Sequence, residues 1–404
     1  MTQIAFADRV RGCLLGAAIG AELGFARAAH PERYQFADPS DALGFTPQRA
    51  IKPEGIEKRV YTASLVPFIN LGVQAYLSAG GRATPEVFAI CLKDDAQVAA
   101  GVFSWDGVHT TQEVLKEGMH PRLAGLLNAP CGLIAAAMPA VGIYHFGDPE
   151  YAYLDGVEMA SVSQPREGAD WAALCAAGVA AAFDPAADAE RIADLALKIA
   201  HRNCKDIFYQ INHLLRLASA NSSNEASFAR WWMTYGGRGD GNNNTAWIAH
   251  NPMMYLLPLF SRYAQDARSF MALMTASTSV SWYDASTGGH PVAATIGGAM
   301  IGAMNGPQAF PAEWLAWAEP IVAPWLAIEQ VIRQRLVVER MAIANAEQLR
   351  ATRSGELSLL EDKVYGCLLA GAIGNAMGSV VEGKHYWEID AQYPDHVLTV
   401  LDPK

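Results

Sequence analysis

Apolar residues recur every three or four positions through most of the chain. This spacing brings side chains onto one face of a helix. It predicts helices over residues 62–79, 171–183, 187–201, 206–218 and 325–350. Few segments show the strict alternation of apolar and polar residues that is typical of a strand. The pattern therefore predicts an all-α fold.

Three dipeptides have the residue types that favour the start of a helix, a capping residue followed by proline. They are Thr84-Pro85, Asp148-Pro149 and Asp184-Pro185. A threonine or aspartate side chain can cap the free N–H groups of a first helical turn, and proline is favoured at the first helical position. We expect a helix to begin at each of them.

A segment near the start of the chain is repeated near its end. Residues 8–24 read DRVRGCLLGAAIGAELG, and residues 362–378 read DKVYGCLLAGAIGNAMG, so the two agree at 10 of 17 positions without a gap. The period is far too long for a solenoid. We expect two successive domains of one fold: a complete helical domain over 1–350, a linker over 351–361, and an incomplete second copy over 362–404. The tail of the second copy can pack on the first domain or be loosely held, and a second homologous domain is a candidate packing partner of the chain.

The first copy of the repeat carries glycine at every fourth position, at Gly12, Gly16, Gly20 and Gly24. Each glycine inside a helix costs about 1 kcal/mol relative to alanine. Four in one row therefore indicate that another backbone approaches closely. A membrane span with small-residue packing is the alternative, and Glu22 opposes it by interrupting the apolar stretch.

Composition and charge narrow the function. The chain has 404 residues, a 51% hydrophobic content and a net charge of -11 without a basic cluster, which argues against nucleic-acid binding. Its longest apolar stretches are too short to span a bilayer, and its N-terminus lacks the pattern of a secretory signal. The six cysteines are scattered without a CxxC pair, which favours reduced thiols over a disulfide framework or a zinc site. We therefore predict a cytoplasmic protein without a membrane or nucleic-acid partner.

The glycine-rich opening resembles that of the ADP-ribosylglycohydrolase family, which includes the dinitrogenase reductase-activating glycohydrolase. Further segments are similar to the family in the same order, at residues 60–82, 128–142 and 281–306, so the resemblance covers most of residues 8–320. It implies an all-α fold and hydrolysis of the N- or O-glycosidic bond of a ribosyl or ADP-ribosyl group. It also implies magnesium, typically as two ions.

The resemblance assigns the metal and ligand sites to two short runs. The family has a Thr-Asp-Asp-Thr run at the start of a helix, where this chain reads Thr62-Ala63-Ser64-Leu65. The family's late Asp-x-Asp-Thr run falls near Tyr283-Asp284-Ala285-Ser286-Thr287. Thr62 and Asp284 are thus the candidate metal ligands, and Ser64 is a candidate ligand-binding residue.

Two aromatic residues adjoin the late run. Trp282 and Tyr283 can stack on an adenine ring, or can belong to the core as aromatic residues of helical domains usually do. No catalytic residue is assigned.

Two functions remain open at this point. Magnesium prefers hard oxygen ligands, and one carboxylate with two hydroxyl groups provides little negative charge for two ions. The chain can be a hydrolase with an altered metal site. It can also be a catalytically silent member of the family, which binds a small ribosyl or ADP-ribosyl ligand or serves as a scaffold.

Overall fold

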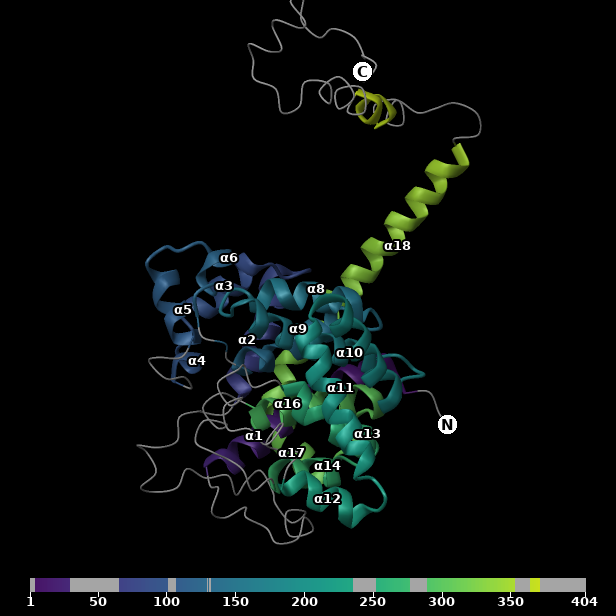
Figure 1. Ribbon diagram of the computed structural model, residues 1–404. Helices are drawn as coiled ribbons and strands as arrows, with labels where there is room; N and C mark the ends of the chain where they lie inside the picture. The colour runs from purple at the N-terminus through teal and green to yellow at the C-terminus, as the bar shows by residue number, and fades with distance from the viewer. Residues whose placement is uncertain are drawn as a thin grey trace, which may run out of the picture. The chain divides into compact units, whose positions relative to one another are not determined.

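The computed structural model describes residues 4–29, 65–100, 107–128, 130, 132–234, 252–276, 289–352 and 364–370 (Figure 1). Regular structure in these residues is helical throughout, which confirms the all-α fold class. The chain divides into two compact units, Met1–Gln334 and Arg335–Lys404, and each is described by itself.

A closely packed pair of helices, α1 (Phe6–Ala29) and α16 (Gly289–Asn305), lies at the centre of the first unit (Figure 1). The two helices run antiparallel. A Cβ atom added to Gly16 would lie 2.0 Å from the carbonyl oxygen of Gly298, and one added to Gly12 would lie 2.5 Å from that of Gly302. Only glycine leaves room for such an approach, so the glycine row has the close backbone contact that the sequence predicts.

The third central helix is α9 (Arg166–Ala182), which is buried along nearly its whole length. It packs against α7 (Met138–Tyr144), α8 (Pro149–Ala160) and α16. Alanine and glycine predominate on α9 and permit close packing on several sides at once. The large core of the unit is built around α1, α9 and α16.

The remaining helices surround this core. On one side lie α2 (Val66–Ala79), α3 (Pro85–Lys93), α4 (Ala96–Ala100), α5 (Gly107–Lys116) and α6 (Pro121–Ala124). On the other lie α10 (Ala189–Asn203), α11 (Lys205–Ala220), α12 (Glu225–Thr234), α13 (Pro252–Tyr263) and α14 (Ala267–Ala276) (Figure 1). The other elements are α17 (Ala312–Val322), α18 (Ile328–Thr352) and the short 3-10 helices η4 (Gly132–Ala137), η7 (Pro307–Ala309) and η8 (Ala323–Ala327).

Two of the three predicted helix starts are confirmed. The Thr84 side chain accepts a hydrogen bond from the backbone N–H of Val87 at the start of α3, and Asp148 accepts one from Tyr151 at the start of α8.

The predicted helix start at Asp184-Pro185 is wrong. There the Asp184 side chain accepts from the backbone N–H of Ala186 at 2.8 Å and closes a turn. The next helix, α10, begins later, and its cap is Asp188, which accepts from Arg191 at 2.8 Å.

The second unit begins within α18. This helix continues through Ala351 and Thr352, which are the first two residues of the predicted linker. The rest of the linker lies outside the described residues, and the domain boundaries at 350 and 361 stay predictions. Residues 364–370, at the start of the second copy, are helical.

None of the helices in the described ranges carries an apolar window long enough to cross a bilayer.

Candidate functional site

The predicted site residues Thr62, Ser64, Trp282, Tyr283 and Asp284 lie outside the described residues. Their roles stay predictions. The structure does describe the helices that follow the two runs. Helix α2 begins at Val66, two residues after Ser64, and α16 begins at Gly289, five residues after Asp284. Each run therefore leads directly into a helix of the core.

Both of these helices are fixed by close packing. In α2, a Cβ atom added to Gly72 would lie 2.2 Å from the carbonyl oxygen of Ala137. In α16, Pro291 lies against Gly24 of α1, and the buried Thr295 hydroxyl donates to the carbonyl oxygen of Pro291 at 2.8 Å. The fold thus holds the start of α2 and the start of α16 in defined places.

The predicted donor set does not fit a binuclear magnesium centre. Thr62 and Ser64 offer neutral hydroxyl oxygens, and Asp284 offers the one carboxylate of the set. Two magnesium ions carry four positive charges and are usually held by several carboxylates and waters. In the part of the chain that the structure describes, no group of three or more His, Cys, Asp or Glu side chains is arranged to hold a metal ion.

A polar cluster around the buried Asp155 links three elements of the first unit, through the buried His145 and the exposed Arg82. Asp155 lies on α8 with its side chain only 2% exposed. One of its oxygens accepts from the Arg82 Nε at 2.9 Å and lies 2.7 Å from the His145 Nε2. Arg82 comes from the loop between α2 and α3, and His145 caps the C-terminus of α7.

The electrostatics of this cluster favour a charged carboxylate. Burial raises the pKa of Asp155, but the hydrogen bonds from His145 and Arg82 outweigh it, so the pKa of Asp155 is lowered overall. Because the carboxylate accepts, the His145 Nε2 donates. Its Nδ1 is buried and has no hydrogen-bond partner among the described residues. The sequence analysis missed this cluster.

A second buried carboxylate, Asp170 on α9, joins α9 to α8. It accepts from the Tyr153 hydroxyl at 2.6 Å and from the Arg166 Nε at 3.0 Å. Burial and the bond to Asp170 raise the pKa of Tyr153, so this phenol stays protonated and acts as a donor. Both clusters use buried charge to fix helix α8, and neither contains a predicted site residue.

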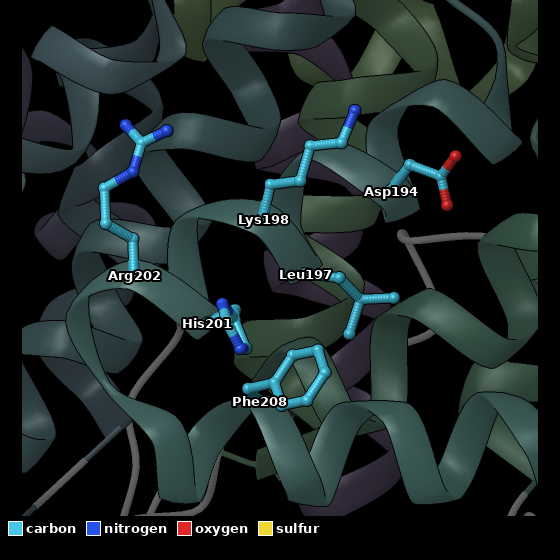
Figure 2. A pocket seen from close by; sticks show the side chains of 6 residues that line it. All are labelled: Asp194, Leu197, Lys198, His201, Arg202 and Phe208. Carbon is cyan, nitrogen blue, oxygen red and sulfur yellow. The ribbon is translucent and has the colours of Figure 1, made fainter.

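An open pocket of about 590 Å³ lies at α10 and α11 (Figure 2). Its lining is Asp194, Leu197, Lys198, His201, Arg202 and Phe208. The His201 and Phe208 rings meet edge to face, with centroids 4.9 Å apart, and form an aromatic wall beside Leu197. The side chains of Lys198 and Arg202 both extend away from this wall, and their charged ends lie apart, that of Lys198 on the side of Asp194 (Figure 2).

The pocket has side chains of both charge signs in its lining. Arg202 is paired with Glu150, whose oxygens lie 2.7 and 2.6 Å from its Nη1. Asp194 lies on α10 four residues before Lys198, so the lining presents no excess of positive charge. The pocket contains none of the residues that the sequence predicts for the ribosyl site.

Comparison with known proteins identifies the family. The family model of ADP-ribosylglycohydrolase matches residues 2–348. A solved structure described as an ADP-ribosylglycohydrolase-related protein complex is 16% identical to the chain; the match covers 81% of this chain and 99% of that chain, with a TM-score of 0.49. No curated protein matches the chain. Because the family model spans most of its length, the chain belongs to the ADP-ribosylglycohydrolase family.

Proposed function

We propose that the chain hydrolyses the N- or O-glycosidic bond of a ribosyl or ADP-ribosyl group. The observation that carries this proposal is the family match over residues 2–348, which contains both predicted runs and the helices that follow them. Close packing holds α2 and α16, the two helices that follow these runs in the sequence, against the core of the first unit.

The predicted residues suit the reaction in distinct ways. Cleavage at the anomeric carbon passes through a transition state with positive charge on the sugar, which a carboxylate stabilises. Asp284 is the candidate for this role. The hydroxyl groups of Thr62 and Ser64 can bind ribose hydroxyls, and Trp282 or Tyr283 can stack on adenine. Magnesium is implied by the family alone.

A second function is favoured by one specific observation. The run at residues 62–65 reads Thr-Ala-Ser-Leu, so it keeps a threonine but contains neither of the two aspartates that the family has in this run. In this alternative the domain is catalytically silent. It binds the ribosyl or ADP-ribosyl group without cleaving it, or serves as a scaffold for a homologous domain.

Turnover and binding, measured on the same samples, separate the two functions. The full chain is incubated with peptides that carry ADP-ribose on arginine or on serine, with and without magnesium, and free ADP-ribose is quantified. Calorimetric titration with ADP-ribose measures binding. Asp284→Asn is compared with Asp94→Asn, which changes an exposed aspartate at the end of α3.

Each outcome is decisive. Release that is lost in Asp284→Asn and kept in Asp94→Asn supports the hydrolase. Binding without release supports the silent alternative and overturns the hydrolase. Neither release nor binding overturns both assignments of a ribosyl ligand.

A further inference from the structure

The exposed apolar side chains of the first unit are concentrated in one region. Among the described residues of this unit, eight large apolar side chains are exposed, and Tyr209 on α11 is one of them. The other seven lie on α3, on α8, or on α6 and the residues that flank it: Ile90, Met119, Leu123, Leu126, Leu127, Tyr151 and Leu154. Single exposed apolar residues are ordinary, whereas a group of seven on neighbouring elements is typical of an association surface.

The three helices that carry these side chains are packed together (Figure 1). Helix α3 contacts both α6 and α8. Gly125 directly follows α6, and a Cβ atom added to it would lie 2.4 Å from the carbonyl oxygen of Ser161, which directly follows α8. On the surface, the Arg122 Nε of α6 lies 2.8 Å from the carboxylate of Glu86 on α3. The Nη2 of the same arginine lies 3.8 Å from Glu158 on α8. One side chain therefore joins the exposed faces of all three helices.

Helical spacing places apolar side chains beside these ion pairs. Ile90 follows Glu86 by four residues on α3, and Leu154 precedes Glu158 by four residues on α8. Residues four apart share a helix face, so each apolar side chain lies one turn from its glutamate. Ile90 is 74% exposed and Leu154 is 53% exposed. The seven apolar side chains and the ion pairs make up one surface, which we call the α3–α6–α8 face.

We propose that the α3–α6–α8 face is an interface between two copies of this chain, related by a two-fold axis. Two properties of the face favour a second copy as its occupant: the amount of apolar surface and the balance of charge. The face contains none of the predicted site residues, so this interface is independent of the proposed hydrolase activity.

The apolar surface is large enough for a dimer. Full burial removes roughly 60–120 Å² of apolar surface for an aliphatic side chain and roughly 150–250 Å² for an aromatic one. Weighted by their exposed fractions, the seven side chains offer on the order of 400 Å² in each copy. Two copies would bury about 800 Å² of apolar surface, which corresponds to an interface of about 1,300 Å² when about 60% of it is apolar. Specific complexes bury about 1,200–2,000 Å².

The charges of the face suit its own copy. Two arginines, Arg82 and Arg122, lie 4.0 and 3.8 Å from Glu158. Glu86 pairs with Arg122, so these ion pairs contain two positive and two negative exposed side chains. The chain as a whole has a net charge of -11, which opposes self-association elsewhere on its surface. At a two-fold axis a surface meets itself and must be self-complementary, and a face with balanced charges meets this requirement.

Sedimentation velocity of the full chain over a series of concentrations tests the interface. The unchanged chain is compared with Ile90→Glu and Leu154→Glu, which place a negative charge within the face. Tyr209→Glu is the matched control, because its side chain is 63% exposed and lies outside the face. Circular dichroism checks that each variant keeps the helical fold, as expected for substitutions of exposed side chains.

We expect the unchanged chain and Tyr209→Glu to form dimers. Ile90→Glu and Leu154→Glu should each raise the dissociation constant of the dimer at least about tenfold, equivalent to about 1.4 kcal/mol. A chain that is monomeric throughout the series overturns the proposal. A dimer that Tyr209→Glu dissociates and the two face variants leave intact also overturns it.

Alkylation of an introduced thiol tests the occupant of the face. In Leu154→Cys, the new thiol should react more slowly as the concentration of the chain rises and the dimer forms, as followed by mass spectrometry. Protection that is complete at every concentration, in a chain that sediments as a monomer, would show that part of the same chain covers the face. That result would contradict the assignment to a second copy.

Discussion

Asp155 is the buried carboxylate that joins Arg82 and His145 in one polar cluster. Its side chain is 2% exposed, yet the hydrogen bonds from Arg82 and His145 keep it ionised. A buried charge is tolerated only when it is paired and hydrogen-bonded. The cluster therefore holds the α2–α3 loop and the end of α7 to α8 through one residue.

Replacement of this carboxylate should destabilise the first unit. Asp155→Asn keeps the shape of the side chain but removes the negative charge of the carboxylate, which accepts hydrogen bonds from Arg82 and His145. Hydrogen bonds to charged groups contribute about 2 kcal/mol each, so we expect a loss of at least about 2 kcal/mol in the free energy of unfolding, measured with urea.

Glu158→Gln is the control, since its carboxylate is 45% exposed and lies 4.0 Å from Arg82. It should change stability by less than about 0.5 kcal/mol, and equal effects of the two variants would contradict the role of Asp155.

The same residue predicts a dependence on pH. The pKa of Asp155 is lower in the folded state than its unfolded value of about 3.9. The contribution of Asp155 to the free energy of unfolding is therefore complete at pH values above the unfolded pKa. It is lost as the pH falls through the folded pKa. The stability difference between the unchanged chain and Asp155→Asn should therefore shrink when the pH is lowered from 6 to 3, as measured by urea unfolding at each pH. A difference that stays constant over this range would show that the ionised carboxylate is not the source.

The cluster also shows what the sequence could not reveal. Asp155 is separated by 10 residues from His145 and by 73 from Arg82, and no spacing rule connects such positions. The contact exists because α2, α7 and α8 pack together. Sequence patterns report periodicity within an element, whereas this cluster depends on tertiary packing.

Among the helices, α1 and α16 form the pair whose geometry the sequence predicts best. A row of glycines is costly in an isolated helix, and the structure shows the backbone of α16 against it. Local signals were less reliable at helix ends. Asp148-Pro149 begins a helix and Asp184-Pro185 closes a turn, because the same two residue types satisfy backbone N–H groups in either setting.

The close approach of this pair gives a direct prediction. Gly16→Ala would place a Cβ atom 2.0 Å from the carbonyl oxygen of Gly298, so the two helices must separate. We expect a loss of about 3 kcal/mol in the free energy of unfolding, at the upper end of the usual cost of overpacking. Gly81→Ala is the matched control, because nothing lies within 4 Å of its added Cβ atom. Thermal and urea unfolding check both variants, and a Gly16→Ala chain as stable as the control would contradict the packing.

The molecule as a whole combines a conserved type of scaffold with an unusual set of predicted ligands. The family match covers residues 2–348, so fold class and family follow from sequence. The site is less well determined by sequence, since the two runs that contain Thr62, Ser64 and Asp284 differ from the family's metal-binding runs at most of their other positions.

The release of ADP-ribose from an ADP-ribosylated peptide, compared between the unchanged chain and Asp284→Asn, tests the proposed function most directly. We predict measurable release by the unchanged chain, and a fall of at least about tenfold in kcat/KM in the variant, equivalent to about 1.4 kcal/mol of transition-state stabilisation. Release that is unaffected by the substitution would contradict the role of Asp284. No release from either arginine- or serine-linked peptides would contradict the assignment of the chain as a hydrolase of these linkages.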